Sequence, residues 1–327
     1  MKNMYWEYAG TRYDQKFKAI EAAGKNSFSI KFHAFNDTFH TFNWSVEPSQ
    51  TFKQLCDMRA FQIREQYSYI KLYFSGGADS VTMLNAFLRN DIFLDEIVCY
   101  RYSLVDDFNC RSNIEVNNYA IPYLLSLNLN KTKIKILDHG KSYFDKLLKD
   151  DKFFYMKNRI DLREYYLPKI KGKNFCHLFG DADPMVQKID NKWYETIYDS
   201  TCFSEYRYRN MEMFFTSENL LELHSKQCHL IKNYYIKNNL DNNDVDSKTV
   251  LRAVARDKPL YEGKDFFHHK SHSVESLNWM AKDKVMLKNA SQAIRDRYKT
   301  ILNTSIDGRR VYDLFTGILS SKHLLGE

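Results

Sequence analysis

The sequence is poor in proline and glycine, with 5 and 11 of these residues in a chain of 327. This scarcity excludes a long flexible or proline-rich linker. None of the six cysteines forms a C-x-x-C pair, so zinc ribbons, thioredoxin-like motifs and the common iron–sulfur spacings have no support. The cysteines are scattered through apolar segments, which is typical of reduced, buried thiols in a cytoplasmic protein.

Long apolar runs are also missing. No segment approaches the roughly 18 uninterrupted apolar residues of a membrane span, and residues 1–24 contain no apolar signal core. We therefore predict a cytoplasmic protein with no membrane partner. The charge excess is small, because a net charge of +7 permits a nucleotide or nucleic acid as partner but requires neither.

What the chain does contain is enough apolar and aromatic material, 44% and 15%, for a sizeable core. At roughly 150 residues per domain, the length allows about two domains. We predict three parts: a small N-terminal α+β appendage over 1–50, a nucleotide-binding α/β domain over 51–205, and a mostly helical C-terminal part over 206–327. In the appendage we expect a helix over 5–24 and a β-hairpin over 28–44.

Strand and helix signals alternate through the second part. Short apolar runs predict strands at 70–74, 97–102, 133–137 and 175–179. Helical patterns follow Ser49, a candidate N-cap, and recur over 81–89 and 114–127. This alternation predicts a parallel sheet with crossover helices. Further on, the sequence favours helices over 218–236, 247–257 and 274–301.

The strongest chemical signal is the hexapeptide Ser75-Gly76-Gly77-Ala78-Asp79-Ser80, between a predicted strand and a predicted helix. Two glycines let the backbone turn tightly and approach a phosphate. The helix that follows presents free N–H groups and the positive end of its dipole, and the two serines add hydroxyl donors. The aspartate would repel a phosphate unless a cation lay between them, so it indicates Mg²⁺. A plain strand–turn–helix connection is the alternative.

This hexapeptide resembles the S-G-G-x-D-S signature of the PP-loop ATP pyrophosphatases. The resemblance implies an adenine nucleotide α-hydrolase-like parallel sheet, with ATP bound at its carboxyl edge and cleaved between the α- and β-phosphates. A Walker A motif, G-x-x-x-x-G-K-[ST], is absent from the sequence, so chemistry at the γ-phosphate is not indicated.

Several later stretches resemble the synthetase domain of asparagine synthetase and of the β-lactam synthetases, over roughly residues 50–270. Gly180-Asp181-Ala182-Asp183 is similar to the family's G-E-G-x-D-E motif, although it is one residue short and lacks both glutamates. Phe214-Phe215-Thr216-Ser217 is similar to P-F-L-D, and 248–252 to the K-x-x-L-R helix. Glu212 stands where the family usually has an arginine, which argues against aspartate as substrate.

The resemblance implies an ATP-dependent ligase. A carboxylate or amide oxygen would be adenylated with release of pyrophosphate, and ammonia or an amine would then form a C–N bond. Ser75, Gly76, Gly77, Asp79 and Ser80 would bind the nucleotide. Asp79 and Asp183 would bind the metal. Asp181 would deprotonate the amine, and Lys264 would stabilise the charge of the departing pyrophosphate. No N-terminal nucleophilic cysteine is present, so we expect any glutaminase to be a separate protein.

Two other readings stay open. The chain could be a PP-loop enzyme that modifies a nucleobase in RNA or DNA, which the mild basic charge and the Arg/Tyr stretch at 206–209 would fit. It could instead be a regulator that binds ATP at a degenerate site, which the altered 180–184 motif would fit. The intact Ser75–Ser80 loop argues against the regulator.

Overall fold

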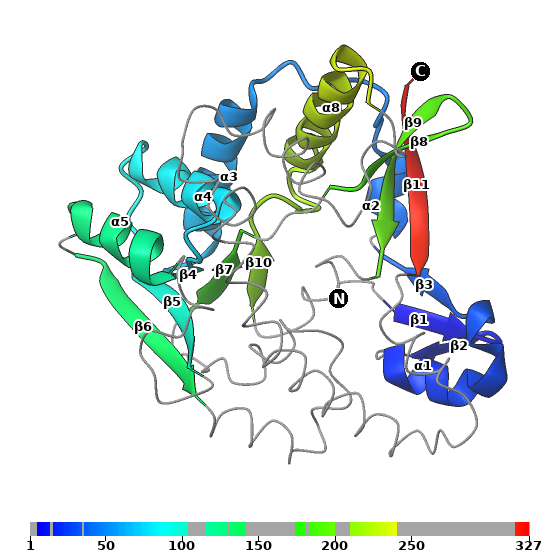
Figure 1. Cartoon of the computed structure of the whole chain (residues 1–327), viewed down its shortest axis with the longest axis horizontal. Coiled ribbons are helices and arrows are strands. Elements are labelled where there is room, and N and C mark those ends of the chain that lie inside the picture. Colours follow the sequence, from blue (N-terminus) through cyan, green and yellow to red (C-terminus); the bar gives the residue numbers. More distant parts are fainter. Residues whose placement is uncertain are drawn as a thin grey trace.

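The structure, a computed structural model, describes residues 5–13, 16–34, 36–103, 116–129, 131–140, 174–180, 184–199, 210–240 and 318–326. Its described segments form three sheets (Figure 1). One is a five-stranded parallel sheet covered by helices, and the other two are three-stranded and antiparallel. No helix among these segments is long and apolar enough to cross a bilayer. The predicted helices over 247–257 and 274–301 lie outside the described residues.

The parallel sheet has the order β10-β7-β4-β5-β6, and all its pairs are parallel. Its strands are β4 (Tyr69–Tyr73), β5 (Glu96–Ser103), β6 (Lys133–Gly140), β7 (Phe175–Phe179) and β10 (Met211–Met213). The chain runs outward from β4 to β6, then returns to the other side of β4 with β7. The order therefore reverses between β4 and β7, and such a switch point is where open α/β sheets leave a crevice for ligands.

Helices cover one face of this sheet (Figure 1). They are α3 (Phe52–Gln66), α4 (Ala78–Leu88) and α5 (Ile121–Ser126), which continues a π-helical turn at Val116–Ala120. Alternate residues of β4, Ile70 and Leu72, pack with Leu55 and Ile63 of α3 in one apolar cluster. The prediction of a parallel sheet flanked by helices is thus confirmed. The cap of α3 is Thr51 rather than Ser49, in a capping box with Gln54.

The second sheet was not predicted. It is antiparallel, in the order β11-β9-β8, with β8 (Val186–Ile189), β9 (Lys192–Tyr198) and β11 (Leu319–Gly326). Helix α8 (Leu221–Lys237), close to the predicted 218–236, lies beside it. Two strands, β10 and β11, therefore fall within the stretch 206–327 that we expected to be mostly helical. Each forms by pairing with residues distant in the sequence.

The appendage corrects two predictions. Residues 5–24 are not one helix, because β1 (Tyr5–Tyr8) and β2 (Thr11–Tyr13) precede α1 (Lys16–Ala23). The Ala9-Gly10 turn between them has φ of 48° and 77°, as two-residue hairpins require. The hairpin expected over 28–44 is also wrong. After a 3-10 turn at Gly24–Ser29, β3 (Lys31–His33) pairs with β1, and α2 (Asn36–Thr41) occupies the expected turn at Asn36-Asp37 and the start of the expected return strand.

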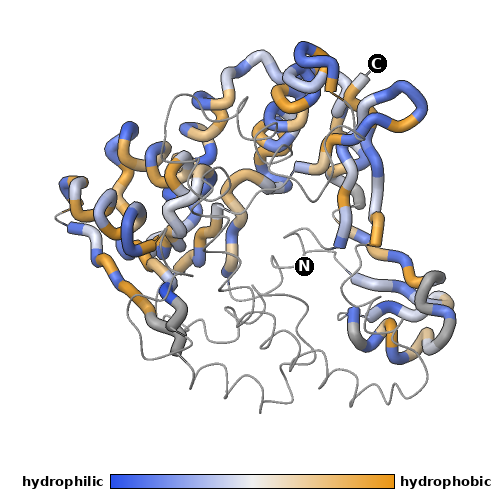
Figure 2. The backbone as a smooth tube through the Cα atoms, in the orientation of Figure 1, coloured by the Kyte–Doolittle hydropathy of each residue, from blue (hydrophilic) through white to orange (hydrophobic). Residues whose placement is uncertain are grey.

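A second apolar cluster joins the appendage to the rest of the chain. It combines Trp6 and Phe32 of the N-terminal sheet, Trp193 of β9 and Ile231 of α8. Figure 2 shows hydrophobic and hydrophilic residues interspersed along α8, as expected for a helix that packs a stripe of its surface. The antiparallel sheets therefore share one core instead of folding as separate units.

A buried ionic contact fastens this arrangement. Asp199, directly after β9, is fully buried. Its Oδ2 accepts a hydrogen bond from the Trp6 indole at 2.8 Å and lies 3.0 Å from the Lys16 ammonium. Its Oδ1 accepts from the backbone N–H of Ile318 at 2.7 Å, just before β11. One carboxylate thus joins β1, α1, β9 and β11.

We expect Asp199→Ala to lower the free energy of unfolding by about 3–5 kcal/mol, because the variant removes the buried carboxylate that lies 3.0 Å from the Lys16 ammonium. Urea unfolding followed by tryptophan fluorescence measures this loss. Glu21→Ala, which removes an exposed acid from the same helix as Lys16, is the control and should change stability by less than about 0.5 kcal/mol. Equal effects of the two variants would contradict the role assigned to Asp199.

Candidate functional site

Two serine side chains hold the loop between β4 and α4. The Ser80 hydroxyl accepts a hydrogen bond from Gly76 N–H at 3.1 Å and donates to the Gly77 carbonyl at 3.0 Å. The Ser75 hydroxyl accepts from Gly77 N–H at 3.3 Å and lies 3.3 Å from the Ser80 hydroxyl. The turn is therefore fixed by its own side chains.

Gly76 permits both the shape of this turn and its packing. Its φ is +82°, in the left-handed region that glycine adopts without strain. A Cβ at this position would lie 2.8 Å from the Cβ of Ala120, at the end of the π-helical turn. Glycine thus allows the loop backbone to approach the helical layer directly.

The first turn of α4 faces the loop without a side-chain cap. Its N-cap residue is Gly77, which offers no side-chain acceptor to the helix amides. Ser75 is exposed, while Gly77, Ala78 and Asp79 are half-buried. A helix of 11 residues that begins with uncapped N–H groups and the positive end of its dipole favours an anion at this place.

A second glycine brings the end of β7 against the start of α4. A Cβ on Gly180 would lie 3.3 Å from the carbonyl carbon and oxygen of Asp79, and 3.2 Å from the Met83 methyl group. Since β7 and β4 are neighbours in the sheet, the segments that follow both strands meet at the switch point. The two motifs singled out in the sequence are therefore adjacent in space at Asp79 and Gly180.

The stretch after β10 reaches the same edge of the sheet. Phe214 N–H donates to the Phe179 carbonyl at 2.9 Å, and Phe214 to Ser217 are all buried. Glu212, just before them, is directed into the core instead. Its carboxylate pairs with the Arg59 guanidinium at 2.9 Å and accepts from the Tyr67 hydroxyl at 2.6 Å. The Glu212 carboxylate is therefore engaged in contacts that join β10 to α3.

Stacked aromatic rings stiffen the strands on the other face, beside the loop. The Tyr73 ring stacks on Phe179 at 4.3 Å and on Tyr100 at 5.4 Å between ring centroids. The Tyr73 hydroxyl lies 3.0 Å from Nδ1 of His177. Burial raises the pKa of Tyr73 far above its ordinary value, so the phenol stays neutral. These contacts hold together the ends of β4 and β7, where the loops of the candidate site begin.

The structure thus brings five of the predicted site residues together in one loop: Ser75, Gly76, Gly77, Asp79 and Ser80. Asp181, Asp183 and Lys264 lie outside the described residues. Sequence reasoning missed a different polar cluster, formed by Glu195, His224 and Cys228. The H-x-x-x-C spacing of the last two, one helical turn apart, was the signal that could have indicated them.

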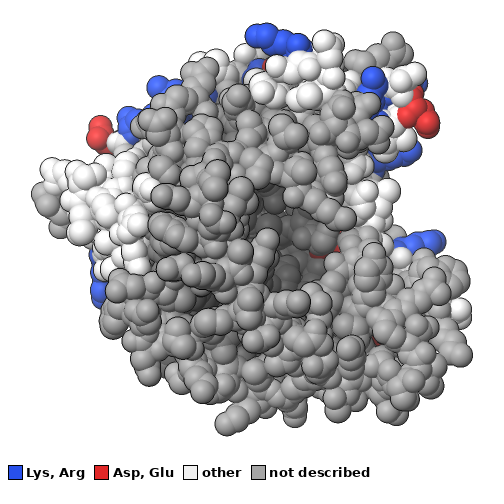
Figure 3. All heavy atoms as spheres, viewed as in Figure 1, with Lys and Arg blue, Asp and Glu red and all other residues white. Residues whose placement is uncertain are grey.

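Comparison with models of known families, with curated proteins and with solved structures found no match to this chain. The site therefore has to be interpreted from its own geometry. On the face drawn in Figure 3, the Lys and Arg side chains of the described residues are scattered around the edge and do not gather over one element. The described residues visible on that face therefore form no extended basic track of the kind that binds nucleic acid.

We expect Gly76→Ala to destabilise the protein more than Gly10→Ala. Both glycines have a positive φ, +82° and +77°, so each alanine carries a backbone cost of about 1–2 kcal/mol. Only at Gly76 does the new methyl group collide with a neighbour, since nothing lies within 4 Å of a Cβ at Gly10. Overpacking should add about 1–3 kcal/mol.

Urea unfolding of the two variants in parallel measures this difference. If Gly10→Ala proved as destabilising as Gly76→Ala, the close approach of the loop to Ala120 would be contradicted.

Proposed function

We propose that this chain is an AMP-forming, ATP-dependent ligase of the PP-loop type, similar to the synthetase domain of asparagine synthetase. The observation that carries the proposal is the place of Ser75–Ser80. This glycine-rich loop leads from β4 into the uncapped N-terminus of α4, directly at the switch point of the parallel sheet. A phosphate-binding loop in an open α/β sheet belongs at this place.

The loop fits a polyphosphate in shape and in chemistry. Gly76 lets the loop pack against Ala120, and the exposed Ser75 offers a hydroxyl to a phosphate. Asp79 stands in the first helical turn, where a carboxylate would repel phosphate on its own. Asp79 would hold Mg²⁺, which when bound would neutralise the charge that develops on pyrophosphate. Asp183, three residues after Gly180, is the second proposed metal ligand.

In the proposed reaction a carboxylate or amide oxygen attacks the α-phosphorus of ATP. The bond to the β-phosphate oxygen breaks, and pyrophosphate leaves. Ammonia or an amine then attacks the activated carbon, AMP departs, and a C–N bond remains. The positive end of the α4 dipole and Lys264 would stabilise the leaving pyrophosphate, and Asp181 would accept a proton from the attacking nitrogen.

The position of Phe214–Ser217 supports the asparagine-synthetase-like branch, because these residues follow β10 at the edge where the loop lies. Glu212 limits the choice of substrate. Since its carboxylate is buried against Arg59, it cannot take over substrate binding from the arginine usual in that family. We therefore propose a small-molecule carboxylate other than aspartate, with the nitrogen donor supplied from outside this chain.

Asp79→Asn should lower AMP and pyrophosphate formation by at least about 100-fold, since it removes a charge that holds the metal against the leaving group. The assay combines purified protein, Mg²⁺ and α-labelled ATP with pools of carboxylates, amino acids, ammonia or nucleic acid. Glu65→Gln, which removes an exposed acid from α3, is the matched control and should keep full activity.

Each outcome distinguishes one reading. AMP formation stimulated by the carboxylate and nitrogen pools supports the ligase, whereas stimulation by RNA or DNA alone supports a nucleobase-modifying enzyme. ADP in place of AMP contradicts cleavage between the α- and β-phosphates. ATP binding without turnover in any pool favours a regulator with a degenerate site.

A further inference from the structure

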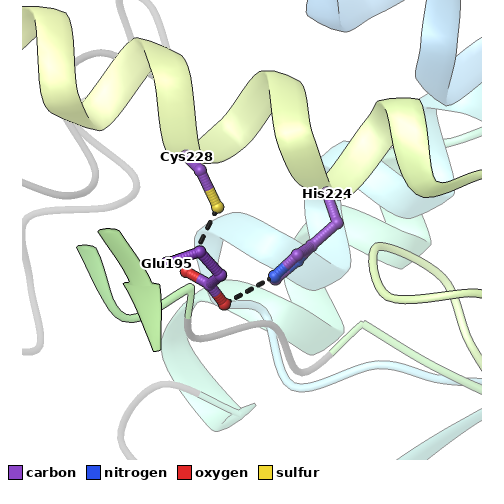
Figure 4. A group of neighbouring side chains, drawn as sticks. All are labelled: Glu195, His224 and Cys228. Carbon is purple, nitrogen blue, oxygen red and sulfur yellow. Dashed lines mark hydrogen bonds and ion pairs between the residues drawn. The ribbon is translucent and has the colours of Figure 1, made fainter. Parts of the chain in front are cut away.

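A polar cluster lies between α8 and β9, apart from the loop described above. His224 and Cys228 project from one side of α8 towards Glu195 of β9 (Figure 4). The Glu195 carboxylate meets Nε2 of His224 at 2.8 Å and accepts from the Cys228 thiol at 3.3 Å. The three donor atoms lie within 4.8 Å of one another, and all three residues are buried.

The surroundings of the cluster are largely aromatic. Trp44 meets the His224 ring edge-on at 5.8 Å between centroids, and Phe39 lies at 6.5 Å. Nδ1 of His224 lies 3.5 Å from the Thr216 hydroxyl, at the long limit of a hydrogen bond. A carboxylate in such a place needs compensation by positive charge, because the apolar neighbours solvate it poorly.

We propose that Glu195, His224 and Cys228 bind a Zn²⁺ ion. Carboxylate, imidazole and thiolate are three donor types that zinc takes in proteins. Two ligands spaced four residues apart on one helix, with the third from a facing element, form a common way to build such a site. This site is independent of the nucleotide loop and of the proposed ligase activity.

The distances fit coordination after small movements. Zn–N, Zn–O and Zn–S bonds of about 2.0–2.3 Å place tetrahedral ligand atoms about 3.4–3.6 Å apart. The contacts of 2.8 and 3.3 Å run to Oε1 and Oε2 of Glu195 respectively and are shorter than these edges, while all the donor atoms lie within 4.8 Å of one another. The carboxylate would therefore have to move away from the imidazole and the thiol to admit the ion. A water completes the fourth position. Thr216 corresponds to the outer-shell partner that usually orients a ligating histidine.

Charge balance also favours the ion. Coordination requires a carboxylate, a thiolate and a neutral imidazole, so the two negative charges cancel those of Zn²⁺ and the buried centre is neutral. Without an ion, burial and then the Glu195 charge raise the pKa of the Cys228 thiol, and the sulfur keeps its proton. The alternative to a metal site is therefore a triad of Glu195, His224 and Cys228 that is joined by hydrogen bonds alone.

Cobalt, which adopts zinc-like geometry and absorbs visible light, tests the proposal. The full chain is stripped with a chelator, dialysed and titrated with Co²⁺. We expect one equivalent to bind, with tetrahedral d–d bands and a thiolate-to-cobalt charge-transfer band, and one equivalent of Zn²⁺ to displace it. Cys228→Ser should abolish the charge-transfer band and weaken binding by at least about 100-fold, since losing an outer-shell partner alone costs roughly 10- to 100-fold.

Cys99→Ser is the matched control. Cys99 is equally buried, with burial raising its pKa to about 12, but it lies in β5 away from the cluster. This variant should keep the band and the affinity. If Cys228→Ser does not fold, Glu195→Gln serves instead. It should keep the thiolate band but need at least about 10-fold more Co²⁺ to reach it.

The proposal is overturned if the wild-type chain binds no stoichiometric Co²⁺. It is overturned equally if the bands arise but persist unchanged in Cys228→Ser. Either result would assign the cluster to the hydrogen-bonded triad.

Discussion

Close backbone approach at two glycines is the constraint on which the candidate nucleotide site depends. Gly76 lets the loop after β4 lie against Ala120, and Gly180 lets the end of β7 lie against Asp79. Neither approach tolerates a Cβ without displacement of a neighbour. The loop can therefore present its backbone at the switch point only because both neighbouring segments come within van der Waals distance of it. The shape of this edge, more than any single charge, supports the proposal that it binds a phosphate.

Buried carboxylates organise the rest of the molecule. Glu212 joins β10 to α3 through Arg59, Glu96 joins β4 to β5 through Lys71, and Asp199 joins the appendage to β9 through Lys16. In each pair a lysine or an arginine lies within hydrogen-bond distance of the acid, as burial of a charge requires. Glu195 differs, because its carboxylate contacts an imidazole and a thiol.

The sequence predicts structure well where the signal is local. The strands β4, β5 and β7 are short apolar runs buried on both faces, and such runs are legible without knowledge of their partners. The strands β8, β9 and β11 mix polar and apolar residues and become strands through pairing, in which Leu324 of β11 lies opposite Tyr194 of β9. No local pattern contains that contact. The same holds for β1, whose partner Phe32 lies opposite Trp6, while the Ala9-Gly10 turn lacks the usual Asn-Gly signal.

The two candidate sites differ in the same respect, because one has a local sequence signal and the other depends on tertiary packing. The candidate nucleotide loop is six consecutive residues, so the chemistry proposed for it can be predicted from the sequence before the fold is known. The Glu195 cluster joins a strand to a helix about 30 residues further along the chain, and only the packing of α8 on the antiparallel sheet brings its donors together. An ion there would bind β9 to α8 directly, since coordination creates bonds that the unfolded chain lacks. Coordination would add to the apolar contacts that Trp193, Ile197 and Leu325 of this sheet already make in the shared core.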